Sequence, residues 1–289
     1  PAFFVFILVA SRVGAWQNAA AMKRLLAILL FACIAALPPL HGVAADDAAL
    51  ARGIEAWRAG DYEAARRLLQ PFADQPEIAY ALGNMAMEGE GGPVDHDAAA
   101  RHYAVGAAGG HVGATANLGF LFDRGWGVAR DGGRAQAHYI IAALQGNVVA
   151  MNNLAYLWGR QGGLLPQALC LSARTLEIEP DNASFLDTYG FILLRLKRAA
   201  EADRYFRRAL EIAPDIAEIW EHRGDAAGLS GGDGSAFWGR ALAVQDDGRL
   251  TGRVTRKLQG GAIELDLNAH TAFELRGEGF ALDCAMPLV

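Results

Sequence analysis

The chain has 289 residues, enough for one large or two ordinary domains. Apolar residues make up 53% of it, and its formal net charge is −6. Because nucleic acids and anionic lipid surfaces are bound through cationic footprints, this acidic balance argues against either of them as the main ligand.

The first part of the chain, residues 1–45, contains no Asp or Glu. Within it the basic pair Lys23-Arg24 precedes an apolar run over 25–37, and small residues follow at Val43-Ala44-Ala45. This order is typical of a secretion signal. We therefore expect residues 22–45 to be a signal peptide.

Cleavage is expected between Ala45 and Asp46, which would place the mature protein in the periplasm or cell envelope. Residues 1–21 precede the signal and are expected not to belong to the native product. The alternative is a membrane-tethered adaptor that keeps residues 22–40 as an anchor. The apolar run is short for a membrane span, and Pro38-Pro39 ends it.

Two cysteines follow the predicted signal, Cys170 and Cys284. They lie far apart and form no CxxC or Cys/His cluster, so neither a zinc site nor a disulfide framework is expected. Cys170 falls at an apolar helical position, where we expect a buried thiol that packs as a small hydrophobic side chain.

The rest of the chain repeats itself. Leu82-Gly83, Leu118-Gly119 and Leu154-Ala155 lie 36 residues apart, and later the period shortens to 34, as between Pro180 and Pro214. Periods of this size are typical of stacked helical hairpins. Such a solenoid offers an extended concave surface rather than a pocket.

We expect six hairpins over residues 46–245, then a capping helix at 246–259 and a loosely ordered tail at 260–289. The first four hairpins are expected at 47–74, 77–109, 113–145 and 149–179.

The second and third hairpins contain residues with a mechanical role. Gly83 and Gly119 permit close approach of two helices, and Tyr103 and Tyr139 fill the space beside them. Asp95 and its copy 36 residues later are expected to cap the second helices. The Gly-x-Gly pairs permit the positive φ of a turn.

These two hairpins resemble the Sel-one-like repeat, and the later ones resemble the tetratricopeptide repeat. The fifth hairpin has the tetratricopeptide spacing at Leu186, Gly190, Leu193, Ala202, Phe206, Ala209 and Pro214. The resemblance covers about 47–245 and implies an all-α, right-handed α-α superhelix. The sixth hairpin has Arg240 where the fifth has Phe206, so we expect it to be looser. Gly234 is expected in a loop that tolerates a side chain.

The capping helix is amphipathic in sequence. We expect its apolar side to cover the last hairpin and its basic side to face water, as solenoid ends require. The apolar side consists of Leu250, Val254 and Leu258, and the basic side of Arg249, Arg253, Arg256 and Lys257.

No pattern of catalytic or metal-binding residues occurs in the sequence. No two histidines have the i, i+4 spacing of a helical metal pair, and no GxSxG or phosphate-binding loop is present. We therefore expect no enzyme activity, no metal and no cofactor. The resemblance leaves one alternative, an enzyme-like protein that binds cell wall or β-lactams, but such members are rich in paired cysteines.

One polar pattern follows the repeat. Asn117, Asn153 and Thr188 occupy one repeat position, and Arg124, Arg160 and Arg195 occupy another. The resemblance implies that the first helix of each hairpin lines the concave face, where these side chains would hold an extended peptide. The Asn residues would clamp its backbone, and the Arg residues would bind carboxylates. Each residue type also has a structural role as the alternative to peptide binding. An Arg side chain in the last turn of a helix interacts favourably with the negative end of the helix dipole, and an Asn side chain can hydrogen-bond between neighbouring helices.

The expected function is thus a non-catalytic scaffold that binds a protein or peptide partner. No nucleic-acid partner is expected, and membrane contact is expected only if the signal segment is retained.

Overall fold

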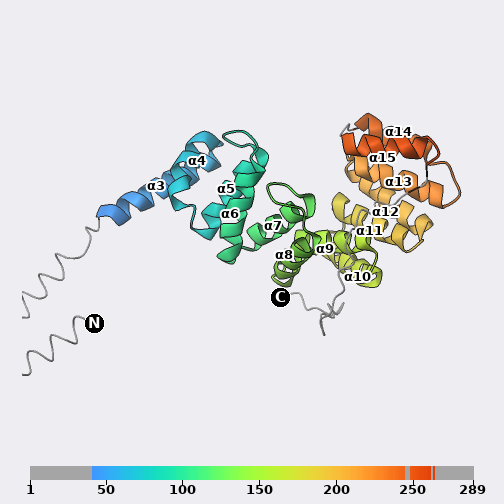
Figure 1. Cartoon of the computed structure of the whole chain (residues 1–289), viewed down its shortest axis with the longest axis horizontal. Helices are drawn as coiled ribbons and strands as arrows, with labels where there is room; N and C mark the ends of the chain where they lie inside the picture. Colours follow the sequence, from blue (N-terminus) through green and yellow to red (C-terminus); the bar gives the residue numbers. More distant parts are fainter. Residues whose placement is uncertain (1–40, 245–247, 262, 264–289) are drawn as a thin grey trace, which may run out of the picture. The chain divides into compact units, whose positions relative to one another are not determined.

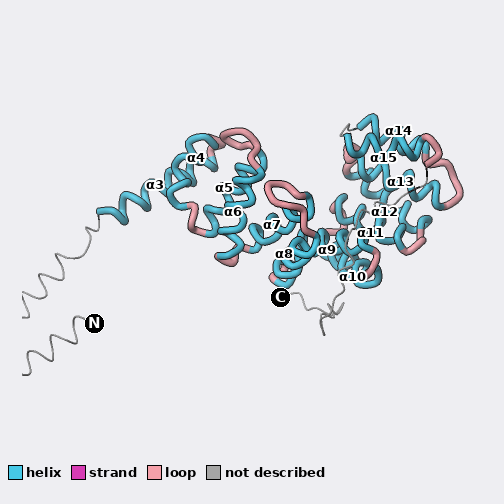
Figure 2. The backbone as a smooth tube through the Cα atoms, viewed as in Figure 1, coloured by secondary structure: helices cyan, strands magenta, loops and turns pink. Residues whose placement is uncertain are grey.

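The computed structural model describes residues 41–244, 248–261 and 263. Within these ranges the regular structure is helical, with thirteen α-helices, one short 3-10 helix and no strand (Figure 2). Contacts divide the chain into two units, residues 1–69 and 70–289. No helix of the described part is long and apolar enough to span a membrane. Most of the predicted signal peptide, and nearly all of the predicted tail, lie outside the described residues.

The first unit contributes one hairpin, made of α3 (His41–Arg58) and α4 (Tyr62–Leu69). A Cβ atom placed on Gly53 would lie 2.7 Å from the Leu69 side chain, so the helices meet where the side chain is smallest. Asp61 caps α4 by accepting a backbone N–H at 3.1 Å.

The second unit contains five hairpins in chain order (Figure 1). Each helix packs on the next, and the first helices of successive hairpins also touch one another in series. After the short 3-10 helix η2 (Gln70–Phe72), the hairpins pair α5 (Pro76–Glu88) with α6 (His96–Ala108), α7 (Val112–Arg124) with α8 (Gly132–Leu144), α9 (Val148–Gln161) with α10 (Leu165–Ile178), α11 (Ala183–Arg195) with α12 (Ala199–Ile212), and α13 (Ala217–Leu229) with α14 (Ser235–Val244). The last helix is α15 (Gly248–Leu258).

A contact between a glycine and an aromatic ring closes several hairpins. A Cβ atom on Gly83 would lie 2.6 Å from the ring of Tyr103, and one on Gly190 would lie 2.6 Å from that of Phe206. Both rings are buried. The expected close approach is therefore confirmed, as is the helix cap at Asp95, whose Oδ1 accepts a backbone N–H at 2.8 Å.

The sixth hairpin closes in the same way, so the expectation of a looser hairpin is wrong at this contact. Trp238, two residues before Arg240, takes the place of the missing Phe, and a Cβ on Gly224 would lie 2.4 Å from its indole. Gly234 does not tolerate a side chain either, because its Cβ would lie 2.3 Å from the Gly224 carbonyl oxygen.

The capping helix α15 is present, but its predicted orientation needs a correction. Leu250 and Val254 are buried as expected, whereas Leu258 is 42% exposed and Lys257 only 6%. The basic side of α15 is thus turned partly toward the protein. The reason is the set of buried carboxylates on α13, which the helical pattern of α15 alone does not reveal.

Cys170 also differs from its prediction. It is half-buried in α10 and disulfide-bonded. The expected buried free thiol is therefore wrong.

Candidate functional site

At the repeat position predicted to bind a peptide, on the first helix of each hairpin, the Asn side chains form hydrogen bonds between neighbouring hairpins. The Asn117 amide donates to Asn84 Oδ1 at 3.2 Å, and the Tyr103 hydroxyl donates to the same oxygen at 2.8 Å. Burial raises the pKa of Tyr103, and its hydrogen bond to Asn117 offsets part of that shift. Asn117 therefore joins α7 to both helices of the preceding hairpin.

Asn153 repeats this arrangement one hairpin later. Its side chain hydrogen-bonds Tyr139, a buried residue of α8 whose pKa burial raises. Thr188, at the same position of α11, is 4% exposed. The role of Asn as a link between helices is thus observed, and Thr188 presents little surface to a ligand.

The three predicted arginines have different surroundings. Arg160 forms an ion pair with Asp123 of α7, and its guanidinium lies 5.3 Å from the Tyr156 ring centroid. The two charged side chains are 12% and 10% exposed. Arg160 therefore joins α9 to α7, and a partner's carboxylate would have to displace Asp123.

Arg124 and Arg195 remain open to a partner. Arg124 is exposed, and its guanidinium lies over the ring of Phe120, 5.3 Å from the centroid. Arg195 is half-buried beside Gly162, and burial lowers its pKa. In the described part of the chain, neither arginine forms an ion pair. These two residues are the best candidates for the predicted carboxylate contacts.

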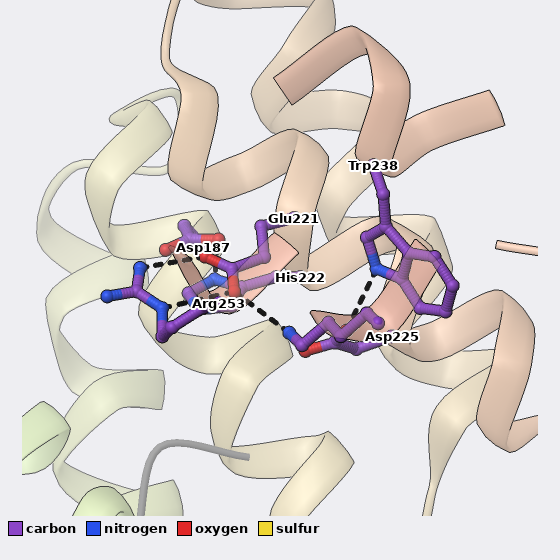
Figure 3. A network of polar contacts seen from close by, with 7 residues as sticks. Asp187, Glu221, His222, Asp225, Trp238 and Arg253 are labelled. Atoms are coloured by element: carbon purple, nitrogen blue, oxygen red, sulfur yellow. Dashed lines mark hydrogen bonds and ion pairs between the residues drawn. The ribbon is translucent and has the colours of Figure 1, made fainter. Parts of the chain in front are cut away.

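A second polar cluster lies where α15 meets α13 and α14. Glu221 accepts hydrogen bonds from Arg253 at 3.2 and 2.8 Å and from Lys257 at 2.8 Å. Asp225 accepts one from Lys257 at 2.7 Å and one from the Trp238 indole at 3.0 Å (Figure 3). We call these five residues, with His222 and Asp187, the cap network.

The cap network shifts the pKa values of its acids in opposite directions. Burial alone would raise the pKa of Glu221, but the bonds and charges of Arg253 and Lys257 outweigh burial and hold that pKa at about 2. Burial raises the pKa of Asp225, and Lys257 offsets only part of the effect. Glu221 is thus held ionised by α15, which fixes the capping helix on the last hairpin.

His222 extends the cap network to α11. Its Nδ1 lies 2.8 Å from Asp187 Oδ1, and both side chains are nearly buried. Burial would lower the pKa of His222, but Asp187, with further contributions from Glu221 and Asp225, raises it to about 8. His222 is therefore charged at neutral pH, and the network holds three acids and three cations.

Sequence reasoning missed the residues that matter most here. Asp187 and Glu221 lie 34 residues apart, at the repeat position just before Thr188 and His222. The spacing of these two acids therefore followed the repeat. The position holds an uncharged residue in the earlier hairpins, so no acidic pattern runs through the whole chain. Among the described residues, no group of three or more His, Cys, Asp or Glu is placed to hold a metal ion.

Comparison with known proteins identifies the fold class. No family model and no curated protein matches the chain. Solved structures similar to it include two repeat proteins. A Sel1 repeat protein from Oxalobacter formigenes has a TM-score of 0.54 and 20% identity over 73% of this chain and 87% of its own. A tetratricopeptide repeat protein from Parabacteroides merdae has a TM-score of 0.55 and 14% identity over 74% and 85%.

The chain therefore has the fold of the tetratricopeptide and Sel1-like repeat proteins, an all-α superhelix. The fold class predicted from the 36- and 34-residue periods is confirmed. At these identities the likeness concerns the fold alone, and function depends on the side chains that the fold carries.

Proposed function

We propose that the protein is a non-catalytic interaction scaffold that binds a segment of a partner protein along the first helices of its hairpins. The observation that carries this proposal is the pair Arg124 and Arg195, which lie at one repeat position and have no ion pair in the described part of the chain. Guanidinium groups bind carboxylates through paired N–H donors. An extended acidic segment, or one with a free terminal carboxylate, suits this surface.

We propose further that the scaffold works in the periplasm or cell envelope. The basic and apolar segments at 23–37 and the small residues before Asp46 support export. The disulfide at Cys170 agrees with an oxidising compartment, since disulfides are rare in the reducing cytosol.

Export is tested by N-terminal sequencing and intact mass of the protein recovered from the periplasm. A product that begins at Asp46 is expected. A product that retains Met22 would contradict cleavage and favour the membrane-tethered alternative.

Partner binding is tested by capture from envelope extract with the exported protein, followed by mass spectrometry. The double variant Arg124→Gln with Arg195→Gln should lose most of the captured partner. The control is Arg204→Gln, which removes an exposed arginine of α12. If the wild type captures nothing beyond a blank resin, the scaffold proposal fails.

A further inference from the structure

Trp126 lies in the turn between α7 and α8, at a place where the preceding hairpin has Glu90. Its indole stacks on His96 with ring centroids 4.7 Å apart and planes 11° apart. Phe120 meets the same indole edge-on at 5.5 Å. Both Trp126 and Phe120 are only half-buried. Arg124 covers Phe120, so one surface combines two aromatic rings and an open cation.

Backbone contacts hold the turn that carries Trp126. The backbone N–H groups of Gly125 and Trp126 both donate to Leu121 O, at 2.8 and 3.1 Å. Gly127 has a φ of 64°, and a Cβ atom there would lie 2.0 Å from the His96 carbonyl oxygen. The turn thus packs closely against the start of α6, and the stacking contact with His96 holds the indole in place without a partner. Binding to such a surface loses little conformational entropy.

The polar atoms of this surface are available. Trp126 is half-buried, and within the described residues its indole N–H has no hydrogen-bond partner. A guanidinium that stacks on a ring keeps its in-plane N–H donors for a carboxylate. The equivalent arginine of the next hairpin, Arg160, is instead paired with Asp123 through its Nη2.

We propose that Trp126, Phe120 and Arg124 form the anchor of the partner site, and that it takes an apolar or aromatic side chain next to a carboxylate. The apolar side chain packs on Trp126 and Phe120, and the carboxylate pairs with Arg124. Trp and Arg are the residue types that most often dominate binding energy at interfaces. This inference rests on the proposed scaffold function and specifies the chemistry of the partner.

Three small probes separate the two parts of the anchor. N-acetyl-phenylalanine has both the ring and the carboxylate, its primary amide lacks the charge, and acetate lacks the ring. Binding is followed by the NMR shift of the Trp126 indole N–H in the full exported protein, with the signal assigned from Trp126→Phe.

N-acetyl-phenylalanine should shift the Trp126 signal at millimolar concentration, and the amide and acetate should bind about fivefold to tenfold more weakly. Arg124→Gln should remove the advantage of the acid over the amide. Arg204→Gln, the matched exposed arginine of α12, should leave it unchanged. Circular dichroism checks that both variants are folded.

Equal binding of the acid and the amide, an effect of Arg124→Gln no larger than that of Arg204→Gln, or no shift of Trp126 would each overturn the anchor. Failure of the anchor can be distinguished from failure of the scaffold function. If the wild type captures an envelope partner and Arg124→Gln captures it equally well, only the anchor is wrong.

Discussion

The hairpins of the second unit are joined to one another by two kinds of chemistry. From α5 to α9 the links are neutral hydrogen bonds, as between Asn84 and Asn117, together with an ion pair, Arg160 with Asp123. From α11 to α15 they are buried charges, as between Asp187 and His222 and between Glu221 and Lys257. The repeat geometry is alike in both regions, since each uses the contact between a glycine and an aromatic ring.

The difference shows what a solenoid requires at its interior and at its end. An interior hairpin is covered by similar hairpins on both sides, so its polar links add to a large apolar contact. The final hairpin is covered by a single helix with little apolar surface, Leu250 and Val254. Paired charges fix the position of that helix, although their desolvation opposes much of the stabilisation.

The largest effect is expected when one cation of the cap network is removed. Lys257→Met leaves Glu221 and Asp225 buried with one partner fewer, and should lower the free energy of unfolding by about 3–5 kcal/mol. Arg256→Met, an exposed neighbour on α15, should change it by less than about 0.5 kcal/mol. Urea denaturation measures the free energy of unfolding of both variants. Equal midpoints would contradict the ion pairs of Lys257 with Glu221 and Asp225.

The next effect tests the contact that both regions share. Gly190→Leu would force a side chain into the Phe206 ring and should destabilise the protein by about 3 kcal/mol. Gly239→Ala is the matched control, because nothing lies within 4 Å of a Cβ atom at this exposed helical position. It should be neutral or stabilise by up to about 1 kcal/mol. Similar losses in both variants would contradict the packing.

The pH dependence of stability should distinguish the charged region. His222 has a pKa of about 8 in the folded protein against 6.5 as its ordinary value. Its stabilisation is therefore fully present below pH 6.5 and is lost as the pH rises through 8, by about 2 kcal/mol in total. His222→Gln should flatten the stability curve in this window. If the free energy of unfolding of this variant fell with pH as steeply as that of the wild type, other titratable groups would account for the pH dependence.

The smallest effect is expected in the neutral region. Asn117→Ala should lower stability by about 1 kcal/mol, because its bond to Asn84 is lost. A double-mutant cycle with Asn84→Ala should show coupling of about 0.5 kcal/mol or more. If the two changes are additive, and Asn117→Ala lowers partner affinity at constant stability, Asn117 is a peptide clamp rather than a link between helices.

Part of the candidate site followed from the sequence, and part did not. Repeat spacing identified Arg124 and Arg195, because one period returns a side chain to the same position of the next hairpin. It also placed Arg160 and Asn117 in that set, although both are engaged by neighbouring helices. Spacing gives the position of a residue but not its partner. The sequence pattern does not single out Trp126, since no repeat period relates it to a second aromatic residue.

The sequence by itself determined the helical hairpins and their order, because apolar periodicity, turn glycines and capping Asp residues act within a few residues of one another. Only the tertiary structure decided which charges are buried. Lys257 faces Glu221 across 36 residues, and Trp238 packs on Gly224 in the place that Phe206 takes in the fifth hairpin, although Arg240 holds the equivalent repeat position. Such choices depend on which side chains meet when hairpins stack, and the helical pattern of one segment does not contain that information.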